Sequence, residues 1–122
     1  MSQIIITKSF QKQLVKFKSV SKKQVVSEIK KHTLGLDVLV DIYSPAPNLK
    51  VLKGYLINKK VRLAVLLVVK NRQYVPFFLA KKESKKGWNI SKQSEKSLEN
   101  YIVKSIQDIK NKDFDTVTWH AT

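Results

Sequence analysis

The side chains best suited to chemistry in this 122-residue chain are basic residues on three consecutive β-rich segments. Lys53 precedes Gly54 in the first segment, Arg62 lies early in the second, and Lys81 and Lys82 end the third. A short turn between the first two segments would put Lys53 and Arg62 within about two residues of being cross-strand neighbours. Antiparallel pairing of the third segment would bring its end beside Arg62. We expect these four cations to converge on one patch.

Four cations around one phosphate suit the cleavage of RNA without a metal ion. The 2′-hydroxyl attacks the adjacent phosphate, and the protein has to align the chain, stabilise added negative charge and move two protons. Neighbouring positive charges favour the neutral form of a lysine, so that one lysine can serve as general base. A second set of residues is expected to contact RNA: Tyr55, Lys59, Lys60, Lys85, Lys86 and Trp88.

Each of these residues also has a purely structural interpretation. Lys53 and Arg62 can flank a polar sheet face, Tyr55 and Trp88 can pack against the core, and a lysine run is often a solvated loop. His120 is close to the end of the sequence and is expected to be a tail residue rather than a catalytic one.

Other chemistries lack the residues they need. The chain has no cysteine, its two histidines are far apart, its three glycines stand alone, and its nine acids form no close pair. Thiolate or histidine metal sites, glycine-rich phosphate loops and paired-carboxylate catalysis are therefore not expected. We expect neither a metal nor a cofactor.

Charge points to a polyanionic partner. The chain has 24 basic and 9 acidic residues, a net charge of +15, with twelve basic residues and one acid between Leu49 and Lys92. This excess attracts RNA or the ribosome, although a generally lysine-rich surface is the alternative. The longest apolar run, Leu63 to Val69, is far shorter than the roughly 20 residues needed to span a bilayer. We expect a soluble, cytoplasmic protein without a membrane partner.

The N-terminal half predicts a strand and two helices. Gln3 to Thr7 is a β-branched run, and Ser9 can cap a helix from Phe10 to about Lys18. Ser21 and Gln24 form a capping box for a second helix that ends before Gly35. The segment 36–43 is ambiguous between strand and helical turn, and 44–48, with two prolines, is expected to be a loop.

Three strands are expected next, over 49–57, 61–69 and 74–81. The middle run is nearly all apolar, as in a strand that is covered on both faces. Pro76 places the last strand at an edge or in a bulge. A helix should follow from about 94 to 110, and the tail 113–122 is not assigned. The apolar side of this helix is expected to consist of Leu98, Tyr101, Ile102, Ile106 and Ile109. The expected fold is a single α+β domain spanning 1–122, with a mainly antiparallel sheet packed by helices.

This order, β-α-α-β-β-β-α, resembles the RelE/ParE superfamily of bacterial toxins from type II toxin–antitoxin systems. Leu52-Lys53-Gly54 is similar to a motif on that family's second strand, and Lys59-Lys60-Val61-Arg62 keeps the basic character of its next strand. The resemblance covers roughly residues 3–86. A second arginine of the family's central strand is replaced here by Leu66-Leu67, and the family's C-terminal His or Tyr has no certain counterpart, with Tyr55 or His120 as substitutes.

In the RelE branch, the resemblance implies a metal-independent, ribosome-associated endoribonuclease that cuts mRNA and inhibits translation. Lys53, Arg62, Lys81 and Lys82 match its catalytic positions. It also implies an acidic antitoxin protein from an adjacent gene. The alternatives are a ParE-like toxin that inhibits gyrase without nuclease activity, and a non-catalytic basic RNA-binding module.

Overall fold

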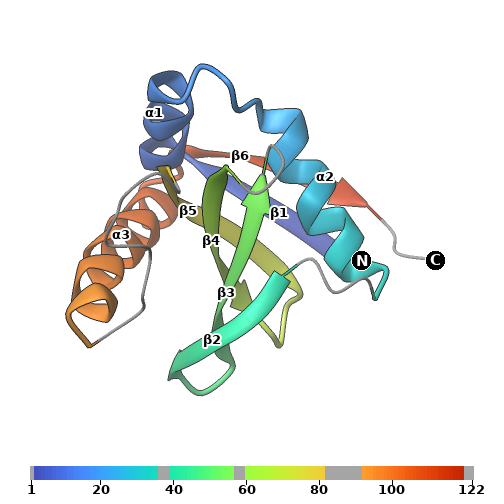
Figure 1. The fold of residues 1–122 in the computed structure, drawn as a ribbon. Helices are drawn as coiled ribbons and strands as arrows, with labels where there is room; N and C mark the ends of the chain where they lie inside the picture. Colours follow the sequence, from blue (N-terminus) through green and yellow to red (C-terminus); the bar gives the residue numbers. More distant parts are fainter. Residues whose placement is uncertain (1, 36–38, 57–59, 82–91, 120–122) are drawn as a thin grey trace.

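A computed structural model describes residues 2–35, 39–56, 60–81 and 92–119, which form three helices and a six-stranded mixed sheet (Figure 1). The elements follow in the order β1 (Ser2–Thr7), α1 (Lys8–Lys16), α2 (Lys22–Thr33), β2 (Leu39–Ala46), β3 (Leu49–Leu56), β4 (Val61–Val68), β5 (Gln73–Lys81), α3 (Lys92–Lys110) and β6 (Phe114–Trp119). The strand order in the sheet is β2-β3-β4-β5-β1-β6. β1 is parallel to β5, and every other neighbouring pair is antiparallel. The fold class is α+β.

The three predicted central strands are confirmed within two residues at each described end. β3 pairs with β4 from Leu49↔Val68 to Leu56↔Val61, and β4 pairs with β5 along its whole length. The first six residues of β4 are all buried, as expected for a continuous apolar strand with a layer on each face.

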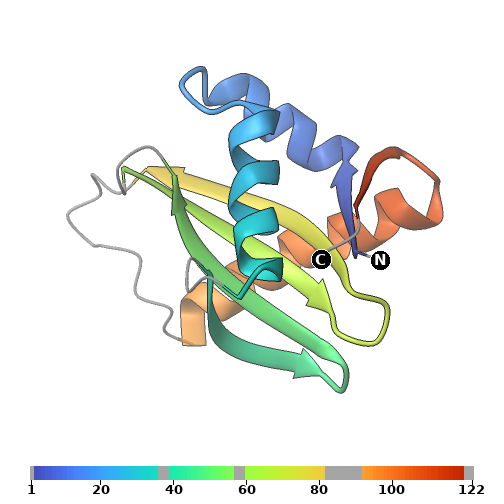
Figure 2. The ribbon, with the colours of Figure 1, turned by 90° about the vertical axis from the view of Figure 1, so that its right-hand side faces the viewer.

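Two hydrophobic cores form, one on each face of the sheet. The first core joins Phe10 of α1 and Val25 and Ile29 of α2 to the sheet, and the second joins Leu98 and Ile102 of α3 to the opposite face. Figure 2 shows α2 in front of the sheet and α3 behind it. Each fully buried Leu, Ile or Phe contributes about 1.5–3 kcal/mol relative to an exposed one. The helices are therefore held on the sheet chiefly by apolar burial.

The helix starts illustrate one success and one error of the sequence prediction. The capping box of α2 is present, with the Ser21 side chain accepting from the Gln24 backbone and the Gln24 side chain accepting from the Ser21 backbone. The predicted cap of the first helix is wrong. Thr7 caps α1, its hydroxyl accepting from Phe10 N at 3.2 Å, and the helix covers 8–16 instead of 10–18. Ser9 lies in the first turn, where it bonds to α3 instead.

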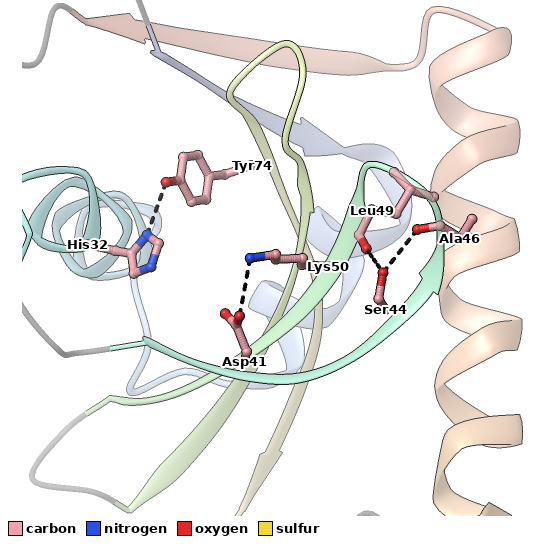
Figure 3. Close-up of polar contacts among 7 residues, drawn as sticks. All are labelled: His32, Asp41, Ser44, Ala46, Leu49, Lys50 and Tyr74. Carbon is pink, nitrogen blue, oxygen red and sulfur yellow. Dashed lines mark hydrogen bonds and ion pairs between the residues drawn. The ribbon is translucent and has the colours of Figure 1, made fainter.

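Residues 36–48 also differ from the expectation. The part of the ambiguous segment that the structure describes is strand, and the expected loop 44–48 is mostly the end of β2 followed by a turn at Pro47 and Asn48. Pro45 is tolerated because β2 is an edge strand. Two register shifts bend β2 along β3. Figure 3 shows the contacts that support it: an Asp41–Lys50 ion pair at 3.4 Å, and the Ser44 hydroxyl donating to two backbone carbonyls across the turn.

The structure decides two points that the sequence left open: the position of Pro76 in the sheet and the secondary structure of the C-terminal tail. β5 is an interior strand, so the edge alternative for Pro76 is wrong, and the bulge alternative is confirmed by the register shift opposite Ala64 and Val65. The unassigned tail contains β6, which pairs with all of β1. The observed order therefore has two strands, β2 and β6, more than the expected one.

The C-terminal end of α2 is attached to the sheet through a polar pair. His32 Nδ1 lies 3.0 Å from the hydroxyl of Tyr74 on β5 (Figure 3). Tyr74 is only 6% exposed. Burial raises the pKa of Tyr74, and the positive charge of Arg72 partly opposes this. The neutral phenol is thus the form that the fold favours.

The C-terminal half of α3 is attached to the start of α1. Asp108 Oδ2 accepts from Ser9 N at 2.8 Å and from Ser9 Oγ at 2.6 Å. A carboxylate at a helix N-terminus satisfies an otherwise unpaired N–H and interacts favourably with the helix dipole. Asp113 O also accepts from Lys8 N at 2.9 Å, at the point where the chain turns into β6.

We expect Asp108→Ala to lower the free energy of unfolding by about 1–3 kcal/mol, because Ser9 loses a charged acceptor for two hydrogen bonds. Urea denaturation followed by circular dichroism measures the change. Glu99→Ala, at an exposed position of the same helix, is the matched control and should change stability by less than about 0.5 kcal/mol. Equal losses in both variants would show that the contact between α3 and α1 contributes nothing specific.

Candidate functional site

Three of the predicted residues share one face of the sheet. Along β3, Val51 belongs to the core under α3 and Leu52 to the core under α1 and α2, so alternation places Lys53 and Tyr55 on the α3 face. On β4, Arg62 has the same parity as Ala64 and Leu66, which belong to the α3-side core. We call Lys53, Tyr55 and Arg62 the sheet-face cluster.

The strand register places Lys53 two residues from being opposite Arg62, as the short turn predicted. Tyr55 is directly opposite Arg62, and Lys53 is opposite Ala64, two residues further along β4. Lys53 Nζ lies 5.9 Å from the centre of the Tyr55 ring, within the range of a cation–π contact. The lysine thus lies over the phenol ring, and the arginine is directly opposite that tyrosine on the neighbouring strand.

The end of β5 approaches the same region of the sheet. Lys81 is opposite Val61, and Ala80 is opposite Arg62. The strand end that carries Lys81 thus lies one register position from Arg62, but Val61 and Leu79 belong to the core under α1 and α2, so the expected convergence of Lys81 on the cluster is not confirmed. Lys60 is exposed in the turn that leads into β4. The other predicted residues lie outside the described part of the chain: Lys59, Lys82, Lys85, Lys86, Trp88 and His120.

Burial differs among the members of the cluster. Arg62 is 9% exposed, whereas Lys53 and Tyr55 are half-buried. A guanidinium so close to apolar neighbours has lost much of its hydration, and its interaction with an anion is stronger than at a fully exposed site. The half-buried pair beside it leaves the cluster accessible from solvent.

α3 covers the neighbouring part of the same face. Phe78 of β5 packs against Tyr101 of α3 with ring centroids 4.8 Å apart, and Leu66 is 3% exposed in the core beneath the helix. The departure at Leu66-Leu67 therefore has a structural explanation: Leu66 belongs to the core beneath α3 and Leu67 to the core on the opposite face. An arginine at Leu66 would be a buried charge.

The cluster has the donors that an oxyanion needs. A guanidinium offers planar, paired N–H donors and an ammonium offers a point charge, and both match phosphate oxygens. The phenol can donate a hydrogen bond or stack on a base. No group of three or more metal-ligating residues occurs within the described residues. None of the described helices has both the length and the apolar composition needed to cross a membrane.

Comparisons with known proteins identify no relative. No protein-family model matches the chain, and neither a curated protein nor a solved structure is significantly similar to it. The functional argument therefore depends on this chain's own residues.

Sequence reasoning missed a second basic surface. Four lysines of α2 line an open groove together with Val117 of β6. The strand that completes the groove, β6, was not predicted, because the tail 113–122 was left unassigned. The alternation of Thr116, Val117 and Thr118 in the tail was the available signal.

We expect Arg62→Met to fold, with a free energy of unfolding within about 1 kcal/mol of the parent. An unbranched apolar side chain of similar length keeps the packing of the arginine stem and removes a charge whose burial carries a desolvation cost. Thermal and urea denaturation measure this. A loss of about 2–5 kcal/mol, as for deletion of a core side chain, would show that Arg62 is retained for stability.

Proposed function

We propose that this chain is the toxin of a toxin–antitoxin pair and acts as a metal-independent mRNA endoribonuclease of RelE type on the ribosome. The observation that carries the proposal is the sheet-face cluster, in which Lys53, Tyr55 and Arg62 meet beside the strand end that carries Lys81. The same proposal includes the RelE-like topology, with β1, α1, α2, β3, β4 and β5 as its common part and β2 and β6 as additions.

Charge supports RNA as the substrate. The net charge is +15, and lysines and an arginine are the groups that neutralise phosphates in sequence-independent contacts. An mRNA held in the ribosome is already positioned, so the protein needs only a few residues directed at one phosphate.

The proposed reaction uses the RNA's own 2′-hydroxyl. Lys53, the lysine of the cluster, removes the 2′-proton, the 2′-oxygen bonds to phosphorus, and the bond from phosphorus to the 5′-oxygen breaks as that oxygen takes the proton of the Tyr55 hydroxyl. The proton on Lys53 then returns to Tyr55. The products are a 2′,3′-cyclic phosphate and a 5′-hydroxyl, and no external oxidant, reductant or water is needed. Arg62 stabilises the transition state, which carries more negative charge on the phosphate than the substrate does, and Lys53 adds to this once it has taken up the 2′-proton. We assign Lys81 and Lys82 to the same set, as further cations for the phosphate.

We expect the purified protein to cleave mRNA on programmed ribosomes in the presence of EDTA and to leave 2′,3′-cyclic phosphate ends. Arg62→Met should lower the cleavage rate by about a hundredfold, because one transition-state contact is lost, while ribosome binding changes much less. Primer extension locates the cuts, and enzymatic end-labelling identifies the phosphate ends.

Lys12→Gln is the matched control. Lys12 is exposed on α1, on the side of the sheet opposite the cluster, and its loss removes the same unit of charge. The Lys12→Gln protein should cleave RNA at the parental rate. Intact RNA combined with inhibited gyrase supercoiling, or cleavage that requires a divalent metal ion, would contradict the proposed mechanism.

Expression of the chain alone should arrest bacterial growth, and co-expression of an acidic protein encoded by a neighbouring gene should restore it. Arg62→Met should abolish the arrest at equal protein level, whereas Lys12→Gln should not. Growth curves with immunoblots measure both effects. Normal growth with folded wild-type protein present would exclude a toxin.

A further inference from the structure

An open groove of about 590 Å³ runs along α2 beside β6. Lys22, Val26, Lys30 and Leu34 recur at intervals of four residues, and so form one row along the helix. Lys23, Ser27 and Lys31 form the adjacent row. Val117 of β6 lines the groove from the sheet side. The groove therefore combines two rows of α2 with the edge of the sheet.

The surface of the groove is both apolar and basic. Val26 and Val117 are partly buried, and Leu34 is 60% exposed although it is a large apolar residue. Lysine stems add apolar area. The ammonium groups of Lys22 and Lys31 form exposed ion pairs with Asp115 of β6 at 3.7 Å and with Glu28 at 3.1 Å, which contribute little at a surface and can be exchanged for carboxylates of a partner. A complementary partner would offer apolar side chains to the groove and carboxylates to the ammonium groups.

Beside this groove, β6 has an edge that is open to pairing. It is the last strand of the sheet, and no described strand lies beyond it. Lys8 N donates to Asp113 O, one position beyond the Thr7↔Phe114 pair that ends the register of β1 and β6. In an antiparallel pair the direction of these groups alternates. Thus Asp115 and Val117 direct their backbone groups to β1, while Phe114, Thr116 and Thr118 direct theirs outward.

On the other side of β1, Gln3 N donates to Arg72 O. This bond agrees with the alternation just described for the backbone groups of β6. Gln3 is opposite Thr118, and a residue that bonds toward β5 cannot bond toward β6 with the same groups. Thr118 therefore belongs to the set that points away from β1.

The two edges of the sheet differ in how they are protected. β2 carries Pro45 and two register shifts, features that discourage pairing with another chain. β6, with the sequence FDTVTW, contains no proline and no lysine, and its pairing with β1 shows no register shift. A regular edge strand of this kind is a template for an additional strand.

We propose that the outer edge of β6 and the lysine rows of α2 together bind an acidic segment of a partner protein in extended form. The segment adds a seventh strand next to β6, with carboxylates and apolar side chains alternating on the side that faces α2. Charge selects this occupant: a second copy of this chain would bring two lysine-lined faces together, each on a molecule of charge +15. Nucleic acid would satisfy the lysines but not the backbone groups of the strand edge. The inference does not depend on RNA cleavage.

The test uses the full chain and a short synthetic peptide. On one face of the peptide glutamate alternates with valine, and threonine occupies the other face. We expect binding by isothermal titration calorimetry, and none for the same peptide with lysine in place of glutamate. In hydrogen exchange by NMR, bound peptide should slow the amides of Phe114, Thr116 and Thr118, whereas Asp115 and Val117, already bonded to β1, should change little.

N-methylation of the peptide tests strand addition directly. Methyl groups on one alternate set of amides remove the donors that face β6, while methyl groups on the other set face solvent. The two methylated peptides should differ in affinity by at least about tenfold, since hydrogen bonds of about 0.5–1.5 kcal/mol are lost in only one. Equal affinities would overturn the extended binding mode.

Variants of the protein test the lysine rows. Lys23→Gln/Lys31→Gln should weaken binding by about tenfold, because two exposed ion pairs of up to about 1 kcal/mol each are lost. Lys12→Gln/Lys104→Gln removes the same charge from exposed positions of α1 and α3 and should bind as the parent does. Equal weakening in both double variants would reduce the effect to overall charge and overturn the site.

Two further results would overturn the choice of occupant. Single-stranded RNA that is bound at β6, with protection of the same three amides and a loss in the Lys23/Lys31 variant, would make RNA the ligand. Sedimentation as a dimer with those amides protected in the absence of peptide would make a second copy the ligand. Neither result would bear on cleavage, which depends on Arg62 on the other face of the sheet.

Discussion

The requirement that β4 be buried on both faces shapes the rest of this structure. Val61, Leu63 and Val65 face one core, and Ala64 and Leu66 face the other. An apolar strand of this kind is stable only with neighbours on both edges and a layer on each side. β3 and β5 supply the neighbours, α1 and α2 one layer, and α3 the other. The connection between β5 and β6 contains α3, and so supplies the layer on the second face.

Because the sheet interior is apolar, charged side chains concentrate at three places: the ends of its strands, its edges and the outer faces of its helices. Arg62 is an exception, since it is 9% exposed near the start of the most buried strand. A charge at such a position carries a desolvation cost. Its placement opposite Tyr55 and two residues from Lys53 in register gives it neighbours suited to anion binding. This combination is the reason that the cluster is the strongest candidate for chemistry among the described residues.

The chain presents two basic surfaces on opposite sides of one sheet. The sheet-face cluster is compact and partly buried, and its geometry suits a single phosphate. The α2 groove is open, mixed with apolar residues and adjacent to an unpaired strand edge, and it suits a polypeptide. Under the two proposals, one sequence with a charge of +15 binds two kinds of anion, because, among the described residues, a regular unpaired strand edge lies beside only the α2 groove. Asp108 and Ser9 connect the helices on the two sides.

Local patterns in the sequence were sufficient for the central strands, the α2 capping box and the position of α3, because each depends on neighbours within a few residues. They also placed Lys53 near Arg62, since a short turn leaves little freedom in register. Local patterns failed where distant segments decide the outcome. Thr7 rather than Ser9 caps α1 because Ser9 bonds to Asp108, 99 residues away. Pro76 lies in an interior strand because β1 pairs with β5, and the tail becomes β6 because β1 offers it an edge. The same long-range pairing creates the groove between α2 and Val117, which no segment of the sequence encodes alone.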